Sequence, residues 1–118
     1  MLSLPPSVRI LLCLEPTDMR RSFDGLSMIA EQVMKQNPFA GHFLVFRNRR
    51  QDRLKILYWD RDGYAIWYKR LEEGTFPFPY FQGDERSLEI SVPDLFAMLG
   101  GIDLSTVKRL KRYQLNSM

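Results

Sequence analysis

The sequence has one cysteine and one histidine, too few for a disulfide framework or for a metal site built from those residue types. It also lacks an apolar run of the roughly 18 residues that a membrane span needs, and residues 1–7 lack the basic start of a signal peptide. We therefore expect a cytoplasmic protein without membrane association, cofactor or metal. Cys13 lies in an apolar run, which predicts a buried thiol.

The composition is that of a protein with a hydrophobic core. Of the 118 residues, 45% are hydrophobic and 13% are aromatic, which is enough for one globular unit. We expect a single domain over residues 1–105. Residues 106–118 form a basic tail with four Lys or Arg and no acid, which fits either a frayed helix or a disordered segment.

The first third of the chain predicts a strand followed by a helix. Residues 8–14 are an apolar run of the length expected for a buried strand. Thr17-Asp18 offers a helix N-cap, and Asn37-Pro38 ends the helix. Gly25 indicates either close packing or a delayed helix start near Asp24. Apolar residues then recur at spacings of three and four, at Met19, Phe23, Leu26, Ile29, Ala30, Val33 and Met34.

The rest of the chain predicts a meander and a second helix. Residues 42–70 alternate strand-like segments with polar turns, and a further short strand is expected at residues 87–90. Ser91-x-x-Asp94 is a capping box, and Gly100-Gly101 ends the short helix that it begins. The predicted fold is α+β: an antiparallel β-meander sheet with one long amphipathic helix packed on it and a short C-terminal helix.

Basic residues are concentrated around the first turn of the meander. Nine residues hold five cations and one acid, and a hairpin turn should project most of the cations outward, as phosphate contacts require. A charged turn that keeps the protein soluble and blocks edge pairing is the alternative. The predicted DNA contacts are Arg47, Arg49, Arg50, Arg53 and Lys55, with Lys69 and Arg70 on the adjoining strand and a weaker signal at Arg20 and Arg21.

Three other groups of residues bear on the chemistry that the chain could perform. Strand parity could place Trp67 and Lys69 on one sheet face with Lys55 and Trp59, which would suit single-stranded nucleic acid, although core packing is favoured. His42 lacks a second His or Cys, so a structural role is expected. Five carboxylates could in principle form a metal-dependent nuclease site, namely Asp18, Asp24, Asp52, Asp60 and Asp62. Three of the five sit where a turn or a helix cap already explains an Asp, so no catalytic residue is predicted.

The order and spacing of several segments resemble a known family across roughly residues 8–103. The matching segments are Thr17-Asp18-Met19-Arg20-Arg21-Ser22-Phe23-Asp24-Gly25-Leu26, residues 37–50 (Asn-Pro-Phe-Ala-Gly-His through Arg49-Arg50), residues 52–60 (Asp-Arg-Leu-Lys-Ile-Leu-Tyr-Trp-Asp), Asp62-Gly63-Tyr64, Tyr68-Lys69-Arg70-Leu71-Glu72 and Gly74-Thr75-Phe76. The sequence departs from the family at Pro77-Phe78-Pro79. The family is the small accessory protein of IS66-type insertion sequences, often called TnpB or Orf-two-like, which is unrelated to the RNA-guided nuclease with the same short name.

The resemblance implies a protein encoded beside a larger transposase that carries the catalytic acids, and it assigns no catalytic residue to this chain. From it we expect a non-catalytic accessory factor for transposition that binds DNA through the basic turn. The alternative is a protein that binds the element's transposase without touching DNA. A metal-dependent nuclease is the third and least favoured class.

Overall fold

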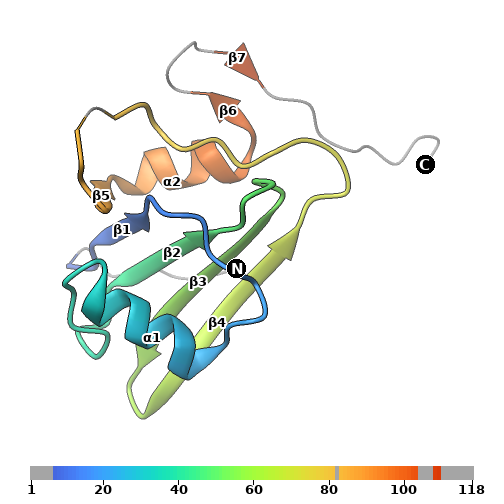
Figure 1. Ribbon diagram of the computed structural model, residues 1–118. Helices are drawn as coiled ribbons and strands as arrows, with labels where there is room; N and C mark the ends of the chain where they lie inside the picture. The colour runs from blue at the N-terminus through green and yellow to red at the C-terminus, as the bar shows by residue number, and fades with distance from the viewer. Residues whose placement is uncertain (1–6, 82, 104–107, 110–118) are drawn as a thin grey trace.

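The computed structural model describes residues 7–81, 83–103 and 108–109. Five strands form one sheet in the order β4-β3-β2-β1-β5, and two short strands pair separately (Figure 1). The elements in chain order are β1 (Ile10–Cys13), α1 (Phe23–Gln32), β2 (Phe43–Arg47), β3 (Arg53–Asp60), β4 (Gly63–Arg70), β5 (Ser87–Ile90), α2 (Val92–Leu99), β6 (Ile102–Asp103) and β7 (Lys108–Arg109).

The large sheet is mixed, so the prediction of a purely antiparallel sheet is wrong in one respect. The meander itself is confirmed, because β2, β3 and β4 pair antiparallel, and so do β1 and β5. However, β1 pairs parallel with β2. The reason is that α1 carries the chain back to the end of the sheet at which β1 begins, so β2 runs in the same direction as β1.

Each face of the sheet is covered by one helix, α1 on one side and α2 on the other (Figure 1). In β2, Phe43 and Val45 pack with Leu95 and Met98 of α2, whereas Leu44 and Phe46 pack with Leu26 and Ala30 of α1. Two cores therefore lie on opposite sides of one sheet. This explains why the central strands show apolar residues at both parities, since a strand buried on both faces has no polar side.

The first helix is shorter than the sequence pattern indicates. It has ten residues and starts at Phe23, with Ser22 as an N-cap whose side chain makes no cap hydrogen bond. The predicted N-cap at Thr17-Asp18 is therefore wrong, and the delayed start that Gly25 suggested is confirmed. Leu26 and Ala30 are fully buried against the sheet, while Ile29 and Val33 are half-buried.

The second helix follows its predicted signals closely. Ser91 accepts a hydrogen bond from the Asp94 amide at 3.2 Å, which confirms Ser91 as the N-cap of the predicted capping box, and Gly100 is the C-cap. Residues 104–107 and 110–118 lie outside the described residues. The predicted domain boundary at residue 105 and most of the basic tail, 106–118, therefore lie there too. Within the tail, Lys108–Arg109 pairs with Ile102–Asp103 as a strand.

Cys13 is buried, as predicted, at the end of β1. Its Sγ donates a hydrogen bond to the Glu15 carbonyl at 3.6 Å. Burial raises the pKa of the Cys13 thiol, so the sulfur stays protonated. In the part of the chain that the structure describes, no helix is long and apolar enough to cross a membrane.

Candidate functional site

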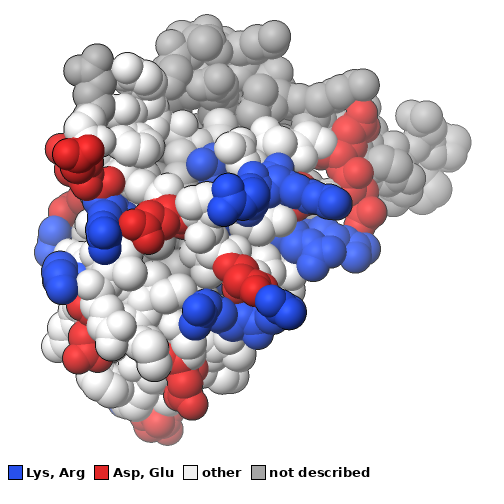
Figure 2. Space-filling model, viewed as in Figure 1, with Lys and Arg blue, Asp and Glu red and all other residues white. Residues whose placement is uncertain are grey.

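Two loops enclose a cleft of about 610 Å³ on one face of the protein. One loop joins β1 to α1, and the other is the turn between β2 and β3. The lining residues are Pro16, Thr17, Asp18, Met19 and Arg20 from the first loop, and Asn48, Arg49, Arg50, Asp52 and Arg53 from the turn. We call this site the arginine cleft. Figure 2 shows Lys and Arg side chains gathered over the turn, the end of β4 and the loop before α1, with acidic side chains between them.

The β2–β3 turn is held by the side chain of Asn48. Its amide nitrogen donates to Asp52 Oδ1 at 2.7 Å, and its oxygen accepts from the Arg53 amide at 2.9 Å. The Gln51 amide donates to the Asn48 carbonyl at 3.0 Å. Asn is favoured at such positions because its side chain mimics a backbone turn. The turn therefore presents Arg49 and Arg50, which are exposed, from a fixed backbone.

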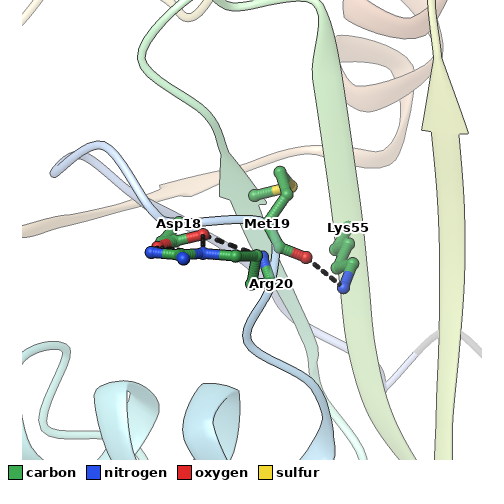
Figure 3. A network of polar contacts seen from close by, with 4 residues as sticks. All are labelled: Asp18, Met19, Arg20 and Lys55. Carbon is green, nitrogen blue, oxygen red and sulfur yellow. Dashed lines mark hydrogen bonds and ion pairs between the residues drawn. The ribbon is translucent and has the colours of Figure 1, made fainter.

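The opposite wall of the cleft carries an ion pair between Asp18 and Arg20 (Figure 3). Arg20 Nη2 lies 2.6 Å from Asp18 Oδ2, and the Arg20 amide donates to Asp18 Oδ1 at 2.9 Å. These hydrogen bonds lower the pKa of Asp18 to about 2. Asp18 thus places a fixed negative charge beside the arginines. The sequence suggested a helix cap here, whereas the structure uses the carboxylate to hold Arg20.

Lys55 does not project from the turn, so that part of the prediction is wrong. Its side chain is buried, with 7% of its surface exposed. The ammonium donates to the Met19 carbonyl at 2.8 Å (Figure 3). It also donates to the Arg21 carbonyl at 2.8 Å and lies 4.7 Å from the centre of the Tyr68 ring. Lys55 on β3 therefore fixes the backbone of the loop that carries Arg20, and it is unavailable to a ligand in the cleft.

Arg47 is likewise occupied inside the protein. Its Nη1 donates to the Phe76 carbonyl at 2.8 Å, and its guanidinium lies 3.7 Å from the centre of the Phe78 ring. Burial lowers the pKa of Arg47 to about 10. The expectation that Arg47 projects outward is therefore also wrong. Its role in the structure is to hold the segment after β4 against the sheet.

The remaining basic residues predicted as contacts lie near the cleft or on another face. Arg53 lines the cleft and lies beside Arg70, its cross-strand neighbour, which forms an ion pair with Glu72 at 2.9 Å. Arg21 is exposed but does not line the cleft. Lys69 pairs with Leu54, so it lies on the α2 side of the sheet.

The suggested single face that combines Trp67 and Lys69 with Lys55 and Trp59 does not form. Trp67 pairs with Ile56 and packs with the α2-side core, whereas Lys55 lies on the other side of the sheet. Core packing, the favoured interpretation of Trp67, is confirmed. His42 accepts a hydrogen bond at Nδ1 from the Arg9 amide at 3.0 Å, in agreement with the structural role expected for it. Among the described residues, no group of three or more His, Cys, Asp or Glu is placed to hold a metal ion.

The arrangement suits recognition of anions more than bond-breaking chemistry. Four guanidinium groups line a single cleft, and three of them, on Arg49, Arg50 and Arg53, form no ion pair with another described residue. Guanidinium groups bind phosphate oxygens in a bidentate geometry. The sequence pattern predicted the arginines of the turn and, as a weaker signal, Arg20. It did not indicate Asn48, which fixes the turn, or the wall that residues 16–19 form beside Arg20.

Comparison with known proteins identifies the family. The family model described as IS66 Orf2 like protein matches residues 8–109. Two curated proteins of Sinorhizobium fredii (strain NBRC 101917 / NGR234) are similar over most of their length. The protein named y4jC is 34% identical over 102 residues, which cover 86% of each chain. The protein named y4hO is 36% identical over 103 residues, which cover 87% of this chain and 88% of its own. No solved structure matches.

Proposed function

The chain belongs to the family of IS66 Orf2-like proteins, and from that premise we propose that it assists transposition of an insertion sequence by binding DNA through the arginine cleft. The proposed contacts are Arg20, Arg49, Arg50 and Arg53, with Arg70 and Arg21 at the margin. In this proposal the protein is a non-catalytic factor, and strand chemistry belongs to the transposase encoded by the same element.

The observation that carries the proposal is the convergence of four arginines on one cleft. Arginines spread over a surface would serve solubility, but arginines that line one cleft repel one another. A ligand that carries several negative charges relieves that repulsion. The fixed backbone of the turn adds to the argument, because a preorganised site loses less entropy when it binds.

The salt dependence of binding tests the proposal quantitatively. Each phosphate that the protein neutralises releases counterions, so four contacts predict a slope of about −3.6 for the logarithm of affinity against the logarithm of salt concentration on duplex DNA. The Arg49→Gln/Arg50→Gln variant should reduce the size of that slope by up to about two units. Fluorescence anisotropy with a labelled duplex, repeated at several salt concentrations, measures both values.

Two control variants locate the contact. Lys35→Gln/Arg61→Gln removes the same charge from two exposed residues that do not line the cleft, so it should leave the slope nearly unchanged. Lys111→Gln/Arg112→Gln removes charge from the basic tail. If the cleft variant keeps the full slope while the tail variant loses it, the cleft is not the DNA contact. If the Lys35/Arg61 variant matches the cleft variant, the attraction is only a general effect of net charge.

A second candidate function is favoured by a group of aromatic rings far along the sheet from the cleft. Phe39, Trp59 and Tyr64 have ring centroids 5.1 to 5.6 Å apart, and 59% of Phe39 is exposed. Exposed aromatic rings are enriched at protein interfaces. This group would suit docking to the element's transposase. Co-purification with that transposase, lost in Phe39→Ser but kept in Arg49→Gln/Arg50→Gln, would support docking over DNA contact.

A further inference from the structure

The outer edge of β4 is long and carries little charge. The strand has eight residues, and the stretch Gly63–Tyr68 contains no charged side chain. Its inner edge pairs with β3, while its outer edge pairs with no strand among the described residues. In Figure 1 no described helix or strand lies along that outer edge. Such an edge leaves backbone donors and acceptors free to pair with another strand.

The opposite edge of the sheet is protected in a way that β4 is not. Strand β5 has four residues, and Glu89 within it forms an ion pair with Arg9 at 2.6 Å. Pro93 follows soon after, at the start of α2. Short length, charge and proline are the usual means by which proteins block edge pairing. Because only one of the two edges is protected, the β4 edge is the one available for pairing.

We propose that β4 pairs antiparallel with β4 of a second copy of this chain, so that two sheets join into one. A two-fold axis at Ile66 gives a register in which Tyr64 lies opposite Tyr68 of the second copy. The same register places Asp62 opposite Arg70 of the second copy. A two-fold axis repeats each pair, so the dimer contains two aromatic pairs and two pairs of opposite charge.

The charges of the strand are what favour a second copy as the occupant. Asp62 precedes β4 and Arg70 ends it, and both are exposed. Antiparallel self-pairing brings these opposite charges together at both ends, whereas parallel pairing would place like charges side by side. Tyr68 is 45% exposed, and cross-strand aromatic pairs stabilise sheets. Within the chain, Arg70 already pairs with Glu72. In the dimer, the Arg70 guanidinium can contact both Glu72 and Asp62 of the second copy. The proposal stands independently of DNA binding by the cleft.

Sedimentation of the full chain over a range of concentrations, from micromolar upward, tests the proposal. We expect a reversible monomer–dimer equilibrium. The single variants Asp62→Arg and Arg70→Asp should each weaken the dimer by about 5- to 30-fold, because each introduces like charges at both ends of the pairing. The combined variant Asp62→Arg/Arg70→Asp restores opposite charges and should recover most of the wild-type affinity.

Hydrogen exchange supplies a second readout at the strand itself. Backbone amides of β4 should exchange more slowly as the protein concentration rises, while those of β5 should not change. A chain that stays monomeric at every concentration overturns the proposal, and an unidentified partner strand would then be the remaining occupant. A dimer whose affinity in both single variants equals that of the wild type, or whose protection lies outside β4, also overturns it.

Discussion

Two basic side chains, Lys55 and Arg47, act inside the protein although they belong to its most basic segment. Lys55 joins β3 to the loop before α1, and Arg47 joins β2 to the segment after β4. Each uses its charge on carbonyl oxygens and an aromatic ring instead of on a carboxylate. The arginines of the cleft therefore depend on the buried Lys55 for the position of the loop before α1, while the half-buried Arg47 holds the segment after β4.

Replacing Lys55 by methionine should destabilise the fold. The substitution keeps most of the length of the side chain but leaves the Met19 and Arg21 carbonyls without their donor, and we expect a loss of about 2 to 4 kcal/mol in the free energy of unfolding. Lys69→Met on the neighbouring strand is the matched control, because Lys69 is exposed, and should change stability by about 0.5 kcal/mol or less. Urea denaturation measures both. Equal losses in the two variants would contradict the role given to Lys55.

The Asp18–Arg20 pair should make stability depend on pH in the acidic range. The pKa of Asp18 is about 2 in the folded protein, below the value of about 3.9 for an unfolded chain. Its contribution is therefore complete above about pH 4 and is lost as the pH falls through 2. The effect is small because the pair is exposed. Urea midpoints of the wild type and Asp18→Asn should differ at pH 5 to 7 and converge toward pH 2.

Asp18→Asn also has an expected effect on the cleft. The substitution removes a negative charge from the wall and releases Arg20, so DNA affinity at low salt should rise severalfold. The same anisotropy assay measures this change. A fall in affinity would mean that the Asp18–Arg20 pair is needed in its present form to hold the site.

At the scale of elements, α1 is fixed by very few buried side chains. Leu26 and Ala30 are the residues of this ten-residue helix that are fully buried. Leu26→Ala should therefore cost about 2 to 5 kcal/mol. Met28→Ala, at a position that is 52% exposed, is the control and should cost little. A denaturation midpoint unchanged by Leu26→Ala would show that α1 does not depend on this contact.

Local signals predicted most of the elements but not how they are arranged. The capping box at Ser91 and the alternation in residues 42–70 depend on neighbouring residues, so both could be recognised in the sequence. The parallel pairing of β1 with β2 depends on where α1 returns the chain, and no local pattern encodes that. The length of α1 was overestimated because Met19 continues the apolar spacing, although it lies in a loop and packs against the same core.

The site, like the fold, could be predicted only where it depends on residues that are neighbours in the sequence. Arg49 and Arg50 could be identified because they are close together in the sequence at a turn. Arg20 reaches the same cleft only through the tertiary fold. The sequence places Lys55 at the surface because charged residues are seldom buried, and its two carbonyl acceptors lie 34 and 36 residues away in the sequence. A prediction from local charge could not include those partners.

At the scale of the whole molecule, we expect no nuclease activity. Among the described residues, no three carboxylates gather to bind a catalytic metal: Asp18 and Asp52 line the arginine cleft but are held by Arg20 and Asn48, and Asp60 lies at the far end of β3. Purified protein should leave supercoiled plasmid intact in magnesium or manganese. Nicking that survives rigorous purification and disappears in Asp60→Ala or Asp62→Ala would refute this expectation.

The buried thiol of Cys13 makes the protein well suited to site-directed labelling. Maleimide reagents react with exposed thiolates, and this sulfur is buried, hydrogen-bonded and kept protonated. A cysteine introduced at an exposed position such as Met28 or Arg61 should therefore take up a fluorophore selectively, without prior removal of Cys13. Energy transfer from such dyes to labelled DNA, or between two labelled copies, would report the orientation of the protein in each complex.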